Sequence, residues 1–188
     1  MVLDDENRLF PQKIERNAVA IYHLRFASYI DRVSKVAGRT QSKRRSGCPV
    51  SIALEEFGDR WSLLIIRDLM VRGYRTFKEF EHSGEGIATN ILAHRLKKLR
   101  AAGIIETEYD LTDRRKLKYR LTPKGIALAP VLLEILIWGA RHEQTGAPCR
   151  MIVHMEANRE AVLAEVRRRW QERDPRPFLP PFTSRARV

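Results

Sequence analysis

Hydrophobic residues recur at intervals of three and four along most of the chain, and glycine, proline and polar clusters interrupt them after short runs. Such spacing is typical of helices that bury one face. The pattern therefore predicts a mainly helical protein. The predicted helices span 48–57, 60–73, 77–83, 88–101, 122–143 and 156–173.

Helix-boundary residues support these segments. Gly58 stands near the end of the first helix. Thr76, followed three residues later by Glu79, has the spacing of a capping box at the start of a short helix. Pro130 is expected to kink the helix over 122–143 or to split it.

Residues 104–122 have a different pattern, which reads as strand, polar loop and strand. The stretches "IIETEYD" and "KLKYRLT" flank the polar "LTDRR". This pattern predicts a β-hairpin that directly follows the helix over 88–101. Basic residues at its tip and on the returning strand make 110–118 a basic loop.

The helix over 88–101 has two unlike faces. A helix turns about 100° per residue, so His94 and Lys97 lie within about 40° of Asn90. The opposite side holds Leu92, Leu96 and Leu99. We expect the leucines to dock on a core while the polar stripe faces outward.

The outward residue types match the chemistry of DNA recognition. Asparagine bonds an adenine edge through two hydrogen bonds, and arginine or lysine reaches guanine acceptors or phosphates. A short helix, a glycine turn and such a second helix form a helix-turn-helix, whose second helix enters the major groove. A basic hairpin placed next to it acts as a wing on the minor groove or the backbone.

We therefore predict a mainly α fold with a small β-hairpin wing, α+β in class: a winged helix-turn-helix. The predicted DNA-binding residues are Thr76, Thr89, Asn90, His94, Arg95, Lys97 and Lys98, with Arg114, Arg115, Lys116 and Lys118 on the wing over 110–118.

Net charge strengthens this interpretation. The 188 residues carry a formal charge of +12. Such a charge favours polyanions, with nucleic acid first and an acidic membrane surface second. A solvated basic helix beside a solvated basic hairpin is the plain alternative, but both features in this order favour DNA.

Other chemistry finds little support. Cys48 and Cys149 are too few for a disulfide scaffold and lack the spacing of a metal site. His82, His94 and His142 have no cysteine or carboxylate at ligand spacing, so we expect no metal and no cofactor. The sequence places no His–Asp or His–Asn pair beside Cys48, so no enzyme activity is expected.

The expected cellular location rests on two kinds of segment, a secretory signal and a membrane span, that the sequence does not show. No secretory signal opens it. The longest apolar run, 126–140, is too short to span a bilayer and contains Pro130 and Glu134. We expect a cytoplasmic, nucleoid-associated protein without a membrane partner.

Residues 44–143 resemble the HxlR-type winged helix-turn-helix transcriptional regulators. The stretches that carry the resemblance are "CPV" at Cys48, "GDRWSLLIIRDL", "FKEFEHSGEGIATNILAHRLKKLRAAGIIE" and "YRLTPKG", the last followed by the helix of Trp138. The resemblance implies a homodimer, a repressor by family habit, bound to a palindromic operator in double-stranded DNA. In the family, helices outside the winged motif make the dimer contact. Here those helices are 48–57 and 123–142.

Cys48 falls where many members of the family carry a cysteine, which in some of them senses oxidants or electrophiles. A thiol near a helix N-terminus is stabilised as the reactive thiolate, and the basic stretch 43–45 precedes it. An oxidant or a small-molecule effector acting there is one hypothesis. The other is a buried structural cysteine that packs like a small apolar residue.

The chain also departs from the family pattern. Ala88 occupies the position where many members have a capping serine, and Thr89 is the alternative cap. The family-like domain over 44–143 is flanked by two extensions. Residues 1–43 are a helical or disordered extension with a basic linker, and 144–188 combine an amphipathic helix with a proline-rich tail, 174–188, that we expect to be disordered.

A second function remains open at this stage. A winged helix can bind a protein instead of DNA, because a fold does not fix a function. An acidic partner would then occupy the basic surface. Competition by duplex DNA distinguishes the two.

Overall fold

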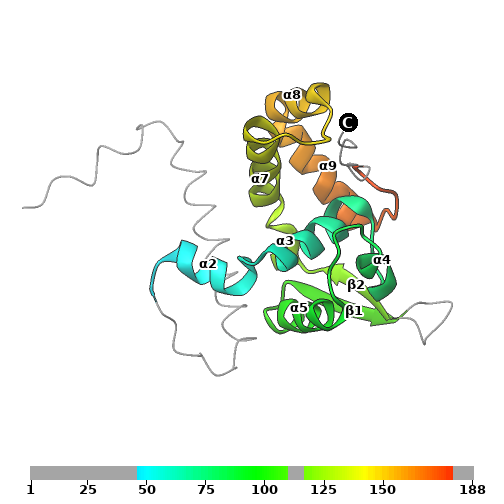
Figure 1. Ribbon diagram of the computed structural model, residues 1–188. Coiled ribbons are helices and arrows are strands. Elements are labelled where there is room, and N and C mark those ends of the chain that lie inside the picture. Colours follow the sequence, from blue (N-terminus) through cyan, green and yellow to red (C-terminus); the bar gives the residue numbers. More distant parts are fainter. Residues whose placement is uncertain (1–45, 110–116, 180–188) are drawn as a thin grey trace, which may run out of the picture. The chain divides into compact units, whose positions relative to one another are not determined.

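The computed structural model describes residues 46–109 and 117–179, which belong to one compact unit that begins at Ser46 (Figure 1). In chain order its elements are α2 (Pro49–Phe57), α3 (Arg60–Arg67), the π-helix η1 (Asp68–Arg72), α4 (Phe77–Glu81), α5 (Thr89–Ala101), β1 (Ile105–Tyr109), β2 (Leu117–Leu121), α6 (Pro123–Ile126), α7 (Ala129–His142), α8 (Cys149–Ala157) and α9 (Arg159–Glu172). The predicted mainly α fold with one hairpin is confirmed. The extension 1–43 and the loop 110–116 lie outside the described residues.

Helix α5 has the two faces that the sequence predicts. Its three leucines, Leu92, Leu96 and Leu99, are at most 3% exposed. They pack with Ile65 and Ile66 of α3 in the main hydrophobic core. The helix ends before Gly103, whose φ of +68° is left-handed and favours glycine over any residue with a side chain.

The short helix α4 begins with the predicted capping box. The Thr76 hydroxyl accepts a hydrogen bond from the Glu79 amide, and the Glu79 carboxylate accepts one from the Thr76 amide at 2.7 Å. Each side chain satisfies an amide that has no partner within the helix. The prediction for this helix start is confirmed.

Strands β1 and β2 form an antiparallel hairpin in which Ile105 is opposite Leu121. Both of these residues are buried in the core beneath α5. The Tyr119 amide donates to the Arg75 carbonyl at 2.7 Å and so fixes β2 to the chain two residues before α4. The hairpin is therefore anchored to both helices of the helix-turn-helix.

The helix predicted over 122–143 is split, as Pro130 suggests. Helix α6 is capped by Thr122, and α7 starts at Ala129 with Pro130 in its first turn. A side chain at Gly125 would bring its Cβ within 2.2 Å of the Ile104 carbonyl oxygen. Glycine is thus required where α6 meets the start of the hairpin.

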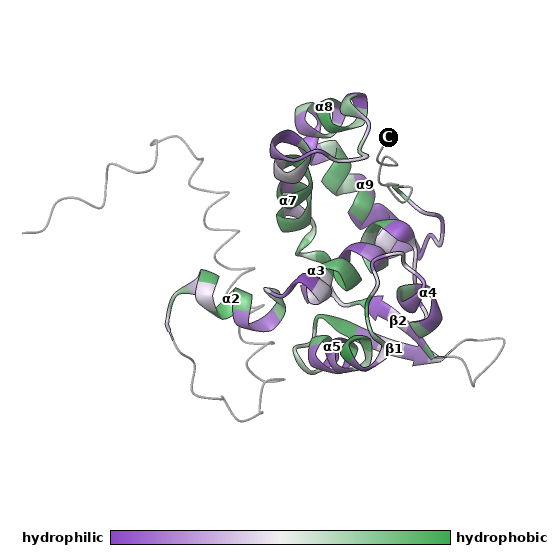
Figure 2. Ribbon diagram, viewed as in Figure 1, coloured by the Kyte–Doolittle hydropathy of each residue, from purple (hydrophilic) through white to green (hydrophobic). Residues whose placement is uncertain are grey.

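Apolar residues of the stretch 123–142 pack inside the protein. By length and composition alone this stretch could cross a membrane. In the structure, Leu133 and Ile137 are buried in a second hydrophobic cluster with Met155 and Val162. Figure 2 shows that hydrophobic positions predominate in the first part of α7. We conclude that this helix is not a membrane span.

The C-terminal helices pack on the rest of the unit. Val162 and Val166 of α9 are buried, as their spacing predicts. The Trp170 indole donates to the Leu121 carbonyl at 2.8 Å, and the Arg120 guanidinium donates to the Trp170 carbonyl at 2.9 Å. These two bonds fasten α9 to strand β2.

One prediction for the C-terminal region was wrong. Helix α8 begins at Cys149 and α9 follows it, but the chain beyond α9 is also ordered. Residues 174–179 are not disordered: the amides of Phe178 and Leu179 both donate to the Val71 carbonyl, at 2.7 and 3.1 Å. Proline-rich composition suggests a solvated chain, but the two apolar side chains pack on the second cluster. Residues 180–188 lie outside the described part.

Candidate nucleic-acid interface

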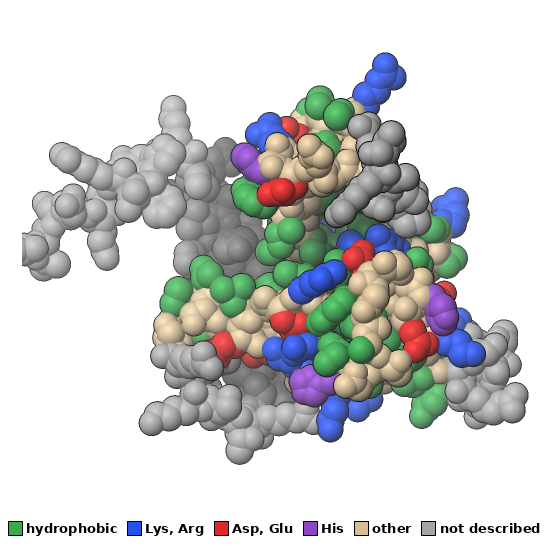
Figure 3. Space-filling model, viewed as in Figure 1, with side chains coloured by type: hydrophobic (Ala, Val, Ile, Leu, Met, Phe, Trp, Pro, Cys, Tyr) green, Lys and Arg blue, Asp and Glu red, His purple; other side chains and the backbone are tan. Residues whose placement is uncertain are grey.

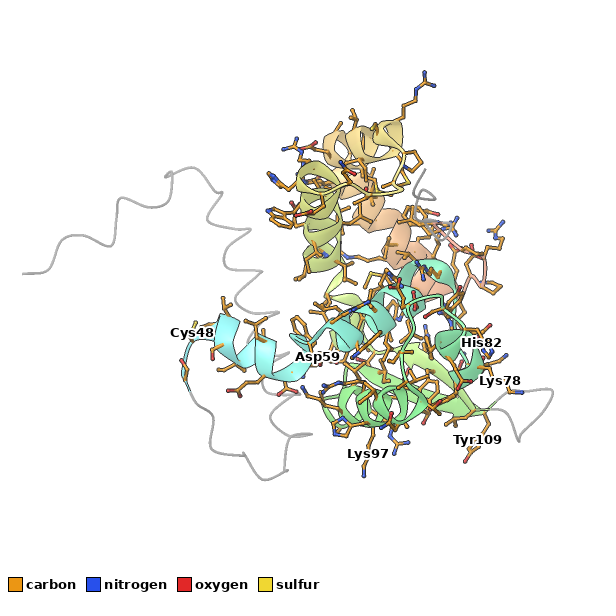
Figure 4. All side chains as sticks on the ribbon, viewed as in Figure 1. Cys48, Asp59, Lys78, His82, Lys97 and Tyr109 are labelled. Carbon is orange, nitrogen blue, oxygen red and sulfur yellow. The ribbon has the colours of Figure 1, made fainter. Side chains whose placement is uncertain are left out.

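The outward face of α5 is a continuous polar surface. Thr89, Asn90, His94 and Lys97 are all exposed, on the side opposite the buried leucines. Lys97 points away from the body of the molecule in Figure 4. The structure therefore brings together the stripe that the sequence predicts, on one face of one helix.

The N-terminus of α5 lacks a side-chain cap. Ala88 is the N-cap residue and makes no capping bond. Thr89 does not replace it, because its hydroxyl donates to Glu81 of α4 at 2.9 Å. The alternative in which Thr89 caps the helix is therefore wrong. An uncapped helix N-terminus can bind an anion such as a DNA phosphate.

Two predicted phosphate contacts have an acidic neighbour. Arg95 Nε lies 3.1 Å from Asp59 Oδ1, and Lys98 Nζ lies 3.9 Å from Asp59 Oδ2. Asp59 is also the N-cap of α3 and accepts from the Ser62 amide at 3.1 Å. Arg95 and Lys98 thus face α3 in part, rather than flanking the polar stripe freely.

The Asp59 carboxylate is held in its charged form. Partial burial acts to raise its pKa, but the Ser62 hydroxyl and amide and the two cations outweigh that effect and lower it. A charged Asp59 therefore neutralises part of the positive charge on α5. The sequence did not reveal this contact, because its partners lie far apart along the chain.

A buried ionic network sets the turn that leads into α5. Arg67 donates to Glu85 at 2.9 Å and pairs with Asp68 at 2.8 Å. Arg72 pairs with Asp68 at 3.3 Å and donates to the Ser83 carbonyl. Burial raises the pKa of Asp68, although both arginines oppose that shift. Arg67 and Asp68 therefore form structural ion pairs.

The wing is described only in its strands. Arg114, Arg115 and Lys116 lie outside the described residues, and Lys118 lies on β2 opposite Glu108. The Ile104 amide donates to the Leu99 carbonyl at 3.0 Å, so the hairpin begins directly against the end of α5. Helix α5 and the β1–β2 hairpin are therefore adjacent, as expected.

Sequence reasoning missed one exposed residue on this side. Tyr109 ends β1 and is 68% exposed, and Figure 4 shows it pointing away from the hairpin. Along β1 the burial falls from Ile105, which is buried, to Tyr109, which gives no reason for an aromatic residue at the exposed end. The only indication in the sequence was an aromatic residue next to the basic loop 110–118.

Figure 3 shows Lys, Arg and His side chains along the edge formed by α5.

Cys48 is exposed and is the N-cap residue of α2. Hydrogen bonds from the Ser51 and Val50 backbone amides lower its pKa. The alternative of a buried structural cysteine therefore does not fit. Both cysteines are free thiols, and no group of residues in the described ranges could hold a metal ion.

Together these features define a DNA-binding protein of the winged helix-turn-helix class: a polar second helix, a turn fixed by ion pairs, and an adjoining hairpin. Residues 56–146 match the family model for the HxlR-like helix-turn-helix. The chain belongs to this family and is a transcriptional regulator.

Similar proteins agree with this assignment. The HTH-type transcriptional regulator YodB of Bacillus subtilis is 36% identical over 100 residues, which cover 53% of this chain and 88% of YodB. YybR of the same organism, described as an uncharacterised HTH-type transcriptional regulator, is 32% identical over 95 residues, or 50% and 75% of the two chains. The crystal structure of PA1607 is 40% identical with a TM-score of 0.50 and covers 56% of this chain and 71% of that one.

Proposed function

We propose that the protein acts in the cytoplasm as a homodimeric repressor that binds a palindromic operator, with α5 in the major groove. The exposed polar face of α5, opposite its buried leucine face, carries this proposal. A packing helix needs only the apolar face. The polar face has the residue types that base edges and phosphates require.

Base choice and affinity come from different side chains in this proposal. Asn90 and His94, with Thr89, read base edges. Lys97, Arg95 and Lys98 contact phosphates, as does Thr76 at the start of α4. On the wing, Arg114, Arg115, Lys116 and Lys118 follow the minor groove or the backbone.

Exposed apolar faces support the dimer. Helix α2 buries no residue, and its Val50 and Leu54 are 66% and 56% exposed. On α7, Ile135 and Trp138 are 47% and 60% exposed. Contiguous exposed apolar surface marks interaction sites. A two-fold dimer would set its two recognition helices about 34 Å apart, one turn of DNA.

Cys48 supports an oxidant or electrophile response. It is exposed, its pKa is lowered, and it opens α2, one of the two helices assigned to the dimer contact. Modification of its thiol would place a new group at that contact. The operator half-sites would then no longer match the spacing of the recognition helices.

Binding to DNA tests the proposal directly. Fluorescence anisotropy compares the duplex upstream of the protein's own gene with a scrambled duplex of equal length, over a series of salt concentrations. We expect tighter binding to the first and a steep salt dependence, at about 0.9 in the logarithmic slope per phosphate contact. Absence of binding to both, at moderate salt, would contradict the proposal and favour a protein-interaction module.

A further inference from the structure

An apolar cavity of about 300 Å³ lies beside the helix-turn-helix core. Its walls come from α3, η1, α7, the loop between α7 and α8, α8, α9 and the C-terminal segment that ends at Leu179. Hydrophobic side chains gather where α7 approaches α3 in Figure 3. The family match covers only part of these walls, because it ends at residue 146.

The cavity reaches into the interior of the protein. Among its lining residues are Leu133, Met155, Val162 and Leu179, each less than 10% exposed, which belong to the second hydrophobic cluster. Val166, also in the lining, belongs to the main core. The space therefore borders both hydrophobic clusters and extends from the surface to buried side chains.

The lining offers almost no polar partner. Arg67 is its one charged residue among the residues described, and its guanidinium is already engaged by Asp68 and Glu85 at 2.8 and 2.9 Å. Thr145 supplies a hydroxyl. Apolar cavities favour apolar molecules over water. The volume lies at the lower end of the range for small-ligand sites.

We propose that this cavity binds a small, neutral, apolar molecule of about the size of two linked aromatic ring systems, such as a phenyl and a naphthyl group, which acts as an effector of DNA binding. The effector role rests on the proposed function; the binding itself does not. Helix α3 provides the link to DNA. Its Leu63 and Leu64 line the cavity, while the next residue, Ile65, packs in the core that holds the α5 leucines.

The shape of the site favours a small molecule over a second copy of the chain. A helix with its side chains is about 10 Å across. Such an element cannot reach side chains that are less than 10% exposed, such as Met155 and Val162. The exposed Val50 and Leu54 of α2 and Trp138 of α7 do not line the cavity and would pair two copies outside it.

The test uses N-phenyl-1-naphthylamine, a neutral probe that fluoresces in apolar surroundings, with the full-length protein. Gly139 lines the cavity on α7, and a Cβ added there meets nothing within 4 Å, so Gly139→Phe directs a ring into the space. Ala140→Phe is a second variant at the same wall. Val153→Phe on α8 is the matched control, because Val153 is 64% exposed and does not line the cavity.

We expect saturable binding of one probe per chain, weakened at least tenfold by Gly139→Phe and by Ala140→Phe, and unchanged within twofold by Val153→Phe. Circular dichroism confirms that the variants fold. Absence of saturable binding would overturn the proposal, as would equal binding by the cavity variants and the control. A third outcome would also overturn the proposal. If the wild-type dimer does not bind the probe and Gly139→Phe no longer forms the dimer, a second copy of the chain covers the cavity.

The effector role has its own measurement. DNA affinity is determined with and without saturating probe, and we expect at least a threefold change in the wild type and none in Gly139→Phe. No change in the wild type would overturn the link to α5. Probe binding that depends on Gly139, in a protein that binds no DNA, would contradict the proposed function and leave the ligand site supported.

Discussion

Arg95 of α5 pairs with Asp59, the N-cap residue of α3, with 3.1 Å between Arg95 Nε and Asp59 Oδ1. The geometry is that of an ion pair without a hydrogen bond, because Arg95 Nε is buried and has no acceptor. The supporting helix thus opposes part of the charge of the DNA-reading helix. A DNA phosphate that approaches Arg95 or Lys98 must compete with this carboxylate.

Asp59→Asn removes the charge and keeps an oxygen that can cap α3, since asparagine caps as well as aspartate. We expect tighter binding to all DNA sequences and a logarithmic salt slope steeper by about 0.9 for each cation released to a phosphate. Anisotropy over a salt series measures both. Glu143→Gln, exposed at the end of α7, makes the same change in net charge. Equal effects of the two variants would show that Arg95 and Lys98 are not released.

Asn90→Ala and Lys97→Ala separate base reading from phosphate binding. Both residues are exposed on α5. We expect Asn90→Ala to reduce the preference for the operator over a scrambled duplex by about 1–3 kcal/mol. Lys97→Ala should weaken binding to both duplexes alike and reduce the salt slope by about 0.9. An unchanged preference in Asn90→Ala would mean that this residue does not read a base.

Acid should weaken the fold through Glu79. Partial burial raises its pKa, but hydrogen bonds from the Arg75 and Thr76 amides outweigh that effect and hold it below the ordinary 4.5. The unfolded chain therefore binds a proton more readily than the folded one, and stability is lost as the pH falls below about 4.5. Denaturant unfolding of Glu79→Gln, which retains a capping box, should show a shallower loss than the wild type. Glu160→Gln, exposed on α9, should not differ from the wild type.

Cys48 should react as a thiolate at lower pH than an ordinary thiol. Amide hydrogen bonds from Ser51 and Val50 lower its pKa from 9.0. In Cys149→Ser, the rate of iodoacetamide modification should reach its midpoint below pH 9.0. A midpoint at or above that value would contradict the assignment. Treatment with N-ethylmaleimide, which adds to a single thiolate, should change DNA binding in the wild type and in Cys149→Ser, and leave Cys48→Ser unaffected.

Trp170→Phe tests the attachment of α9 to the hairpin. The change removes the hydrogen bond from the indole to the Leu121 carbonyl and leaves an apolar ring next to Arg120. A carbonyl deprived of its donor costs about 1–3 kcal/mol. Denaturant unfolding should show that loss. Tyr109→Phe, on the exposed end of β1, should change stability by less than about 0.5 kcal/mol. Similar losses in both would argue against a role for the indole.

Local patterns predicted what depends on neighbours in the chain. The faces of α5 follow from helical periodicity, and the start of α4 follows from Thr76 and Glu79 alone. The break near Pro130 was equally visible, because proline removes a helical hydrogen bond wherever it stands. The polar stripe of the candidate site could therefore be read from the sequence.

Contacts between distant segments could not be predicted in this way. Neither the pairing of Asp59 with Arg95 nor the bonds from Phe178 and Leu179 to the Val71 carbonyl leave a periodic signal. The cavity is of the same kind, since its lining residues come from widely separated parts of the chain, from Leu63 to Leu179. The proline-rich composition of 174–188 predicted a disordered tail, and this prediction was wrong for residues 174–179.

The bond from Trp170 to the Leu121 carbonyl also bears on synthesis. A ribosome delivers the chain from its N-terminus, and domains fold as their parts emerge. Strand β2 is released before α9, so the nascent hairpin has its sequence but not the partner that secures its last residue. The finished DNA-binding form therefore arises only after α9 has been synthesised, and a message truncated before Trp170 would yield a regulator with an unsecured wing.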